Sequence, residues 1–440
     1  MGAGRVRLRS NSPQGRAAPL GAATGRVSRS EALRSIGRSL RHRNYSLFFS
    51  GQAVSLIGTW MQMVALSWLV YEMTGSEWLL GLVGFAARIP IFFLSPLAGT
   101  FIDRIEGRRL ILGTQTAAMV LAFVMAGLAL SGAITVWEII LLSVLLGVVN
   151  AIDIPARQTF VVRMVGKADL SNAIALNSSL VNIARTVGPA IGGWTVAALG
   201  EGWCFAINGA SFLAVIVALL MMRIEDIAAP RAPVKTLGHM AEGMRYMRRT
   251  PRIRSVLLLL GVVSVTGVPF MVLLPVFAGR LGAGGAEVLG TMMAAAGIGS
   301  LLAAAPLAMV RDPARVDIWP IWATVGFGLT LIVFALPVPY WLSLAILVPV
   351  GFFMMLQSAA SNTVLQHLVA DDMRGRVMAV YAMMFMGMIP FGSLLAGAVA
   401  ERIGAAWTVA GGGAFCLVAG AVALFVYRRG QPQSDMAAST

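Results

Sequence analysis

Twelve apolar segments separated by short polar ones constrain this chain more than any other feature of its sequence. Each is close to the roughly 20 residues that a helix needs to cross the hydrocarbon core of a bilayer. Inside lipid a chain must satisfy its own backbone hydrogen bonds, which favours helices for segments this long. With 58% hydrophobic and 12% charged residues, the composition is that of an all-α membrane protein. We expect twelve transmembrane helices near residues 47–72, 78–102, 109–131, 136–156, 174–199, 203–222, 254–278, 286–309, 316–337, 340–365, 376–400 and 405–427.

Charge alternates between successive loops. The loops after even-numbered segments are basic, and they carry Arg104, Arg108, Arg109, Arg157, Arg163, Lys167, Arg223, Arg311, Arg315, Arg374, Arg376, Arg428 and Arg429. The opposite loops carry Glu72, Glu77, Glu138, Glu201, Glu287 and Glu401, with only Arg280 and Arg402 basic. The positive-inside rule then places both termini in the cytoplasm of a cell whose inner (plasma) membrane the chain spans. The same rule accounts for the net charge of +15. The charge therefore does not indicate that the chain binds nucleic acid.

Several function classes are excluded by residues that the chain lacks. Neither Lys167 nor Lys235 ends a G-x-x-x-x-G-K-[ST] loop, so the chain is not an ATPase of that type. The three histidines are isolated and no carboxylate pair or nucleophile arrangement appears, which predicts no metal site, no catalytic residue and no cofactor. Cys204 and Cys416 lie far apart inside apolar runs and are interpreted as core residues. Energy for transport must come from an ion gradient or a partner.

Polar stretches divide the chain into five parts. Residues 1–44 are arginine-rich and predict a disordered, basic cytoplasmic tail touching anionic lipid, with a mitochondrial transit peptide as the alternative. Residues 45–222 and 253–427 are two six-helix bundles, and 428–440 are a cytoplasmic C-terminal tail. Residues 223–252 form a cytoplasmic linker with an amphipathic pattern suited to the inner leaflet.

The two bundles resemble each other in sequence. TFVVRMVGKADL, starting at Thr159, and TVLQHLVADDMR, starting at Thr363, follow corresponding helices. Each precedes a helix that carries a proline among glycines. A parallel repeat of six helices predicts two pseudo-symmetric halves with a binding site between them at the membrane midplane.

The loop between the second and third segments, GTFIDRIEGRR at residues 99–109, resembles a known signature. In the major facilitator superfamily the pattern is glycine, three residues, Asp-Arg and a basic cluster. The residues that match are Gly99, Asp103, Arg104, Arg108 and Arg109. Gly107 falls one residue late, which is similar to the branch with the enterobactin exporter and its multidrug relatives. The resemblance implies the twelve-helix facilitator fold and a gate in which Asp103 locks the halves together on the inside. A plain positive-inside turn is the alternative.

A second resemblance lies in GPAIGG at residues 188–193. It is similar to the end of the antiporter signature of the same superfamily, which is associated with export. The matching residues are Gly188, Pro189, Gly192 and Gly193. Asn177 and Ala184 stand where the signature has earlier glycines. Ordinary close packing of helices is the alternative.

The charged residues that we expect to be buried within or beside predicted spans are Arg88, Asp153, Arg157 and Arg185. Such charges cost about 2.5–3.5 kcal/mol on insertion scales and usually face the protein interior or water. We favour a structural ion pair of Asp153 with Arg157 or Arg185. The alternative is that Asp153 carries the coupled proton, with Glu138 as a weaker candidate.

The resemblance also implies that helices 1, 4, 7 and 10 line a central cavity. Aromatic and amide side chains there suit a large, partly apolar substrate. For each of them, core packing is the alternative. The candidates are Gln52, Trp60, Gln62, Trp68, Asn150, Asn182, Ser264, Phe270, Gln357, Ser361 and Asn362.

These observations predict a secondary transporter that exports a small, partly apolar molecule, such as a siderophore or drug, by alternating access and proton antiport. We expect a monomer whose partners are the substrate, protons and the bilayer. The alternatives are a facilitator or importer, including a lysophospholipid flippase, and a transporter-like sensor without flux.

Overall fold

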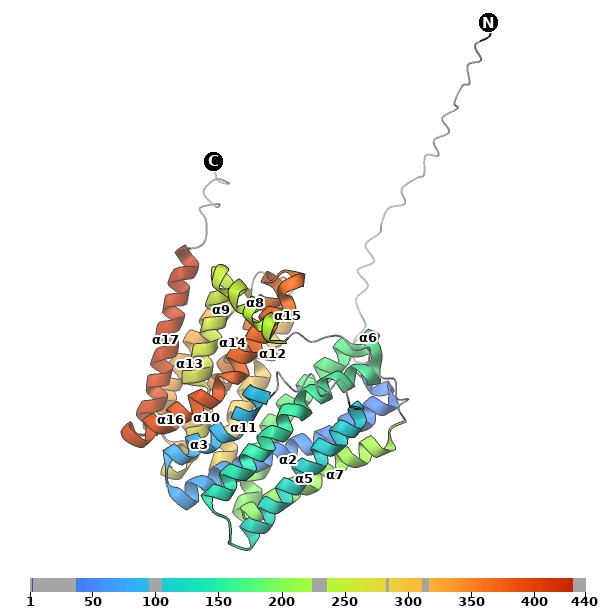
Figure 1. Ribbon diagram of the computed structural model, residues 1–440. Coiled ribbons are helices and arrows are strands. Elements are labelled where there is room, and N and C mark those ends of the chain that lie inside the picture. The colour runs from blue at the N-terminus through green and yellow to red at the C-terminus, as the bar shows by residue number, and fades with distance from the viewer. Residues whose placement is uncertain are drawn as a thin grey trace.

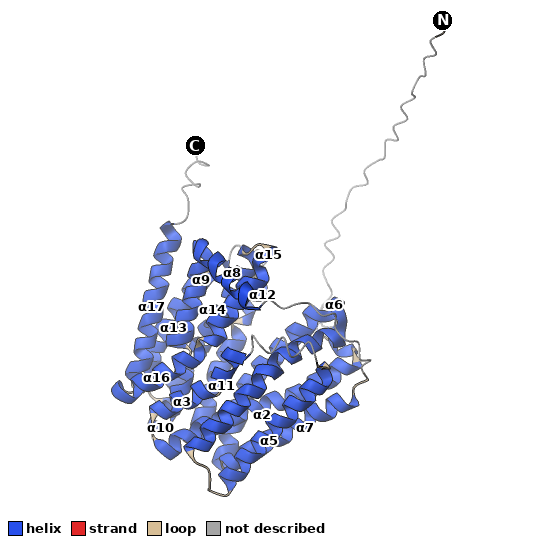
Figure 2. Ribbon diagram, viewed as in Figure 1, coloured by secondary structure: helices blue, strands red, loops and turns tan. Residues whose placement is uncertain are grey.

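The computed structural model describes residues 2, 37–94, 105–223, 236–281, 285–310 and 316–429. Within these residues every regular element is a helix and no strand occurs (Figure 2), so the predicted all-α class is confirmed. Three residues of the predicted gate, Gly99, Asp103 and Arg104, lie outside the described residues. So do most of the predicted N-terminal tail, residues 224–235 of the predicted linker and residues 430–440.

Ten helical stretches in the described part are long and apolar enough to cross a membrane, and Trp319–Ala335 is a shorter apolar helix. This agrees with a multi-pass membrane protein. Figure 1 labels most of the helices. They are η1 (Arg38–Arg41), α2 (Arg43–Thr74), α3 (Glu77–Ala86), α5 (Gly107–Leu130), α6 (Val136–Leu199), α7 (Glu201–Met221), α8 (Thr236–Arg249), α9 (Pro251–Val262), η2 (Val263–Gly267), α10 (Phe270–Arg280), α11 (Ala286–Leu302), α12 (Ala304–Met309), α13 (Trp319–Ala335), α14 (Tyr340–Leu368), α15 (Asp371–Ala382), η4 (Met383–Gly387), α16 (Ile389–Ile403) and α17 (Ala405–Arg429).

Small residues set the spacing of helices α2, α5, α6 and α7, which pack on one another. A Cβ added to Gly51 of α2 would lie 2.8 Å from the carbonyl oxygen of Ala214 on α7. One added to Gly58 would lie 2.5 Å from Ser211 Oγ. Glycine at these positions therefore lets the two helices approach closely, as small residues do in membrane bundles.

Helix α6 covers 64 residues but bends sharply at Gly166, where φ is 68° and ψ is 178°. A side chain is strained at this positive φ, so glycine suits the bend. The bend separates the segments predicted at 136–156 and 174–199. The polar residues between those segments, which the sequence suggested as a loop, continue the helices on both sides.

Two predicted helices are interrupted by π-helical turns. η2 lies between α9 and α10, directly before Val268 and Pro269, and η4 lies between α15 and α16, shortly before Pro390. Proline has no backbone N–H and its ring crowds the preceding turn. A locally wider π turn accommodates this without ending the span.

The helices up to α7 form one set, and those from α8 onwards form the other. The two sets meet through α6 with α11 and through α3 with α16. One end of the molecule carries Glu77, Glu138, Glu201, Glu287 and Glu401, and the other carries Arg38, Arg109, Arg249, Arg376 and Arg428. We call these the acidic end and the basic end. The contacts of α3 with α16 lie towards the acidic end, and in Figure 1 the two sets diverge from there towards the basic end, where α8 and α15 lie.

Candidate functional site: a buried ion pair and two arginines without counter-ions

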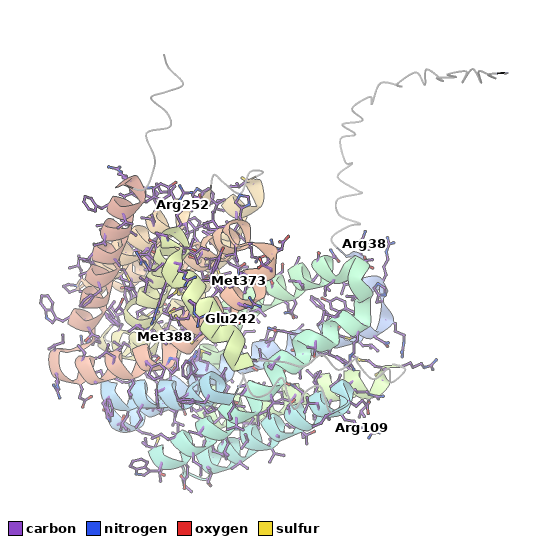
Figure 3. All side chains as sticks on the ribbon, turned by 45° about the horizontal axis from the view of Figure 1, so that its top comes forward. Arg38, Arg109, Glu242, Arg252, Met373 and Met388 are labelled. Atoms are coloured by element: carbon purple, nitrogen blue, oxygen red, sulfur yellow. The ribbon has the colours of Figure 1, made fainter. Side chains whose placement is uncertain are left out.

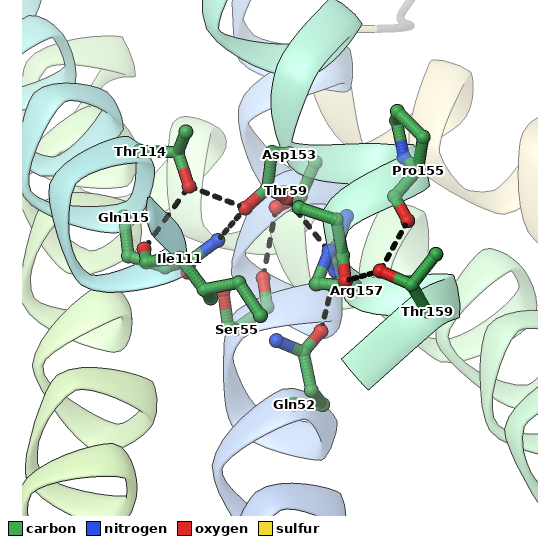
Figure 4. Close-up of polar contacts among 11 residues, drawn as sticks. Gln52, Ser55, Thr59, Ile111, Thr114, Gln115, Asp153, Pro155, Arg157 and Thr159 are labelled. Carbon is green, nitrogen blue, oxygen red and sulfur yellow. Dashed lines mark hydrogen bonds and ion pairs between the residues drawn. The ribbon is translucent and has the colours of Figure 1, made fainter. Parts of the chain in front are cut away.

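Asp153 on α6 is the centre of a polar network inside the first set of helices (Figure 4). Only 2% of the residue is exposed. Its Oδ1 accepts hydrogen bonds from Thr114 Oγ1 at 2.7 Å and Gln115 Nε2 at 3.0 Å, both on α5. Its Oδ2 lies 2.7 Å from Nε of Arg157, four residues further along α6. Both carboxylate oxygens therefore have polar partners within the helices.

The network extends to α2 through Arg157, whose Nη1 donates to Gln52 Oε1 at 2.5 Å. Of the two partners expected for Asp153, the structure selects Arg157, since residues four apart share one face of a helix. Gln52 Nε2 and Gln115 Oε1 are buried and have no hydrogen-bond partner in the described part of the chain. The network ties three helices together and has two unsatisfied polar atoms at its edge.

The charge of the Asp153–Arg157 pair can be changed by one proton. A buried ion pair is neutral as a unit, and removing one charge leaves the other uncompensated. A proton bound to Asp153 would leave Arg157 positive inside the helices. The packing of α2, α5 and α6 around the pair can therefore respond to one proton.

Arg88 and Arg185 form a second group. Arg88 follows α3 in a turn, and Arg185 lies on the second part of α6. The guanidinium carbon of Arg185 lies 5.2 Å from the ring centroid of Trp60 on α2, which is a cation–π contact. Its Nε is buried without a hydrogen-bond partner among the described residues. Neither arginine has a described carboxylate as its counter-ion.

Two arginines of the predicted gate are described. Arg108 Nη2 donates to the carbonyl oxygen of Leu220 at 3.1 Å, at the C-terminal end of α7. Arg109 Nε lies 2.6 Å from Glu106 Oε2, and 80% of its side chain is exposed. Arg108 thus satisfies a carbonyl that a helix end leaves free. The gate role stays a prediction, because its aspartate lies outside the described residues.

The glycines of the GPAIGG motif lie at helix contacts. A Cβ on Gly188 would lie 2.5 Å from Cβ of Trp60, and one on Gly192 would lie 2.8 Å from Cα of Met61. A Cβ on Gly193 would lie 2.5 Å from the carbonyl oxygen of Ala286, on α11 of the other set. The motif therefore packs α6 tightly against both α2 and α11.

The residues predicted to line a cavity lie in different surroundings. Gln62 is buried and accepts a hydrogen bond from Asn208 Nδ2 on α7 at 2.5 Å. Gln357 is fully buried and donates to Ser361. Phe270 is 2% exposed and packs against Phe327 and Phe334.

The remaining cavity candidates are less buried. Asn182 Nδ2 donates to the Ser178 carbonyl oxygen within α6, and Asn362 accepts from Gln366. Trp60 lies beside Arg185, and Asn150 is half-buried on α6. Of these four residues, Trp60 is the one that a described contact joins to a charged group, as Gln52 is joined to Arg157. The others stay predictions as substrate contacts.

The hydrogen bonds that join α16 to the start of α3 at the acidic end were not predicted from the sequence. Glu401 Oε2 accepts hydrogen bonds from Ser76 Oγ at 3.0 Å and from the Trp78 backbone N–H at 2.9 Å. The carboxylate of α16 thus sits at the N-terminus of α3, where an anion is favoured. Arg280 Nη2 lies 3.9 Å from Glu77 Oε1 nearby. The sequence marks a helix start at Ser76, because this serine directly precedes Glu77. It gives no indication that Ser76 contacts Glu401.

A second contact that the sequence did not reveal lies at the basic end. Asp169, just past the bend of α6, accepts a hydrogen bond from His42 at 2.8 Å and lies 2.5 Å from Arg38 Nε. Ser39 N–H donates to Asn172 Oδ1. The hydrogen bond from His42, and then the guanidinium of Arg38, hold the pKa of the Asp169 carboxyl below its usual range. These contacts fasten η1 to α6. Figure 3 labels Arg38 at the start of this segment.

No group of three or more His, Cys, Asp or Glu side chains gathers closely enough to hold a metal ion within the described residues.

Residues 38–440 match the model of a family described as transmembrane secretion effector, which is one of major facilitator transporters. The chain is 27% identical over 365 residues to the staphyloferrin A transporter of Staphylococcus aureus, covering 81% of this chain and 89% of that one. It is 28% identical over 383 residues to the multidrug efflux pump Tap of Mycolicibacterium fortuitum, covering 84% and 92%. It is 25% identical to the enterobactin exporter EntS of Shigella boydii, covering 76% and 80%.

Solved structures show the same fold. A bacterial homolog of the human lysosomal transporter Spinster, in an inward-facing and unoccupied conformation, aligns with a TM-score of 0.69 at 15% identity, covering 88% of this chain and 97% of that one. The nucleoside transporter NupG aligns with a TM-score of 0.66 at 16% identity, covering 88% and 99%.

Proposed function

Because the chain belongs to the transmembrane secretion effector family of major facilitator transporters, we propose that it is a secondary active exporter of the plasma membrane that works by alternating access. One observation carries the proposal. The two sets of helices touch through glycines and Glu401 near the acidic end and diverge towards the basic end (Figure 1). This is the arrangement expected of one of two alternating states.

The proposed topology has twelve helices in two halves. It adds the shorter apolar helix α13 and the part of α6 after Gly166 to the ten longer spans. Residues 45–222 and 253–427 are the two six-helix bundles. Residues 223–252 are the linker, in which Glu242 of α8 contacts Arg376 of α15 at 2.9 Å. Figure 3 labels Glu242 of α8. It also labels Arg252, at the start of the next helix, and Met373 of α15.

The proposed orientation places the basic end in the cytoplasm, since arginine and lysine accumulate on that side of a membrane. The described conformation is then open to the cytoplasm, and export requires that it close there. Arg108 and Arg109 lie at the start of α5 at that end. In the proposal they close it with Gly99, Asp103 and Arg104.

Proton antiport is the proposed energy source, with Asp153 as the coupling acid. The support is its burial and its bond to Arg157, because a proton there changes the charge of a network that joins three helices. A proton that enters down the membrane potential supplies about 2.3 kcal/mol per 100 mV. The named relatives move staphyloferrin A, enterobactin and drugs. We therefore propose a small, partly apolar substrate of similar kind, moved by a monomer.

The experiment uses inverted membrane vesicles with an imposed inside-acidic pH gradient. Siderophores, macrolides and lipophilic dyes are added singly while the gradient is followed by a pH-sensitive dye. Proton-coupled export predicts dissipation that depends on the substrate, is lost in Asp153→Asn and is retained in Asp153→Glu, which keeps a titratable carboxyl.

Other outcomes select other functions. Substrate entry without dissipation in the wild type would replace the proposal with a facilitator or lysophospholipid flippase. Tight binding without any flux would replace it with a sensor.

A further inference from the structure

Arg88 and Arg185 stand out because the described residues give neither a counter-ion. Both are only partly exposed. Neither makes an ion pair or a hydrogen bond through its side chain with the described part of the chain. A guanidinium inside a membrane domain costs several kcal/mol unless it has a partner or water. Each arginine offers five N–H donors and accepts nothing, so the partner that is missing is an anion or another acceptor.

The geometry at Arg185 leaves its donors available. Its guanidinium carbon lies 5.2 Å from the centroid of the Trp60 ring. A cation–π contact uses the face of the guanidinium and leaves the N–H edges free. The Nε atom is buried without a partner in the described residues. An acceptor placed at this edge would meet a donor that the fold itself does not satisfy.

Arg88 lies against a different part of the fold. The turn that carries it packs on the first part of α6, since a Cβ on Gly147 would lie 2.7 Å from the carbonyl oxygen of Ala87. Arg185 lies on the second part of α6, after the bend at Gly166. The site is therefore built on Arg185 and Trp60.

The site also lies where the two sets of helices meet. A Cβ on Gly297 of α11 would lie 3.1 Å from the carbonyl oxygen of Arg185 and 2.7 Å from Thr186 Oγ1. Movement of α11 against α6 would therefore change the surroundings of Arg185. A ligand held here is placed to sense, and to bias, the alternation between states.

We propose that Arg185 and Trp60 form a binding site for the anionic group, a carboxylate or phosphate, of a partly apolar molecule. The guanidinium of Arg185 pairs with the anion, and the indole ring of Trp60 contacts the adjoining apolar part. This deepens the proposed function by naming its substrate class, and rests on it.

Binding is tested on purified full-length protein in a neutral detergent, with fluorescein as the anionic probe and rhodamine 6G as the cationic one. Fluorescence anisotropy gives the dissociation constants. Arg185→Gln should raise the dissociation constant for fluorescein at least tenfold, about 1.4 kcal/mol, and leave the constant for rhodamine 6G unchanged. Arg185→Lys should restore part of the loss. Arg402→Gln, an exposed arginine at the acidic end, should have no effect.

Competition identifies the source of the anion. Displacement of fluorescein by citrate indicates a soluble carboxylate, and displacement by lysophosphatidylglycerol indicates a lipid phosphate. The inference is overturned if wild-type protein binds neither fluorescein, citrate nor lysophosphatidylglycerol, or binds them no better than an Arg185→Gln variant that elutes as a folded monomer.

Transport separates this inference from the proposed function. Fluorescein that binds but does not move across vesicles would keep the anion site and overturn export. Rhodamine 6G that moves, with no anion bound, would keep export and overturn the site.

Discussion

The backbones of Gly81 on α3 and Gly397 on α16 touch, so that a Cβ added to Gly397 would lie 2.8 Å from Cα of Gly81. The contact joins the two sets of helices near the acidic end. A side chain at either position would have to push one helix away, because the atoms that it meets belong to backbone.

Gly81→Leu is therefore expected to separate the acidic end. Overpacking costs about 1–3 kcal/mol, which shifts an equilibrium between two states by roughly five- to 150-fold. Spin labels at Trp137→Cys and Trp341→Cys, on exposed residues that begin α6 and α14, report the distance between the halves by pulsed electron resonance. The distance should lengthen in Gly81→Leu. Gly113→Leu is the control, since nothing lies within 4 Å of its added Cβ. An unchanged distance distribution in Gly81→Leu would contradict the assignment.

Glu401→Ala should act on the same equilibrium by another route. It removes the acceptor for Ser76 Oγ and the Trp78 N–H, and losing such a helix cap costs roughly 0.5–2 kcal/mol. The same spin-label pair should show a smaller lengthening than with Gly81→Leu. Glu401→Gln keeps a neutral acceptor and is expected to fall between wild type and Glu401→Ala. If Glu401→Gln and Glu401→Ala behave alike, the charge alone matters and the hydrogen bonds do not.

The ion pair of Asp153 and Arg157 predicts a stability pattern. Arg157→Gln leaves Asp153 charged and buried, and Asp153→Asn leaves Arg157 uncompensated, so each should destabilise the protein by about 3–5 kcal/mol. The double variant removes both charges and should recover much of the loss. Thermal unfolding of detergent-purified protein measures all four members of this cycle. Additive losses would show that the two side chains do not interact energetically.

The contact of η1 with α6 predicts a dependence on pH. The pKa of Asp169 is lowered by the His42 hydrogen bond and by Arg38. Its stabilising contribution is therefore present above the ordinary carboxyl pKa of about 3.9, and is lost as the pH falls through the lowered value. A spin label at Gly37→Cys should become mobile in that acid range.

In the variant Asp169→Asn the label should be mobile at neutral pH already. Asp371→Asn serves as control, because Asp371 is an exposed carboxylate that pairs with Arg374 at the other set of helices. If the label is equally immobile in Asp169→Asn and in the wild type, the Asp169 carboxylate does not hold η1 in place.

Helix positions were predictable from the sequence because each span needs a long apolar run. The π turns before Pro269 and Pro390 were not predicted, since an apolar run gives no sign of a local change in winding. Gly166 is one of several glycines with a positive φ. It differs from the others in lying inside a long helix, which no sequence pattern marks.

The site was predictable only in part. Asp153 and Arg157 are four residues apart, so their pairing follows from helical geometry once α6 continues past residue 156, where the predicted span ended. The hydrogen bonds of Asp153 to Thr114 and Gln115 depend on how α5 is rotated against α6, which side-chain packing decides. Gln62 shows the same limit, since it contacts Asn208 inside one set of helices.

The glycine contacts of the acidic end have a thermal consequence. Glycine has no side chain to immobilise, so bringing Gly81 onto Gly397 and Gly193 onto Gly290 costs little rotamer entropy. In the proposed transport cycle, closing the basic end would instead order long arginine side chains, each with up to about 2 kcal/mol of such entropy. Warming should therefore favour the conformer that is joined by glycines, and cooling should favour the one that is joined by arginines.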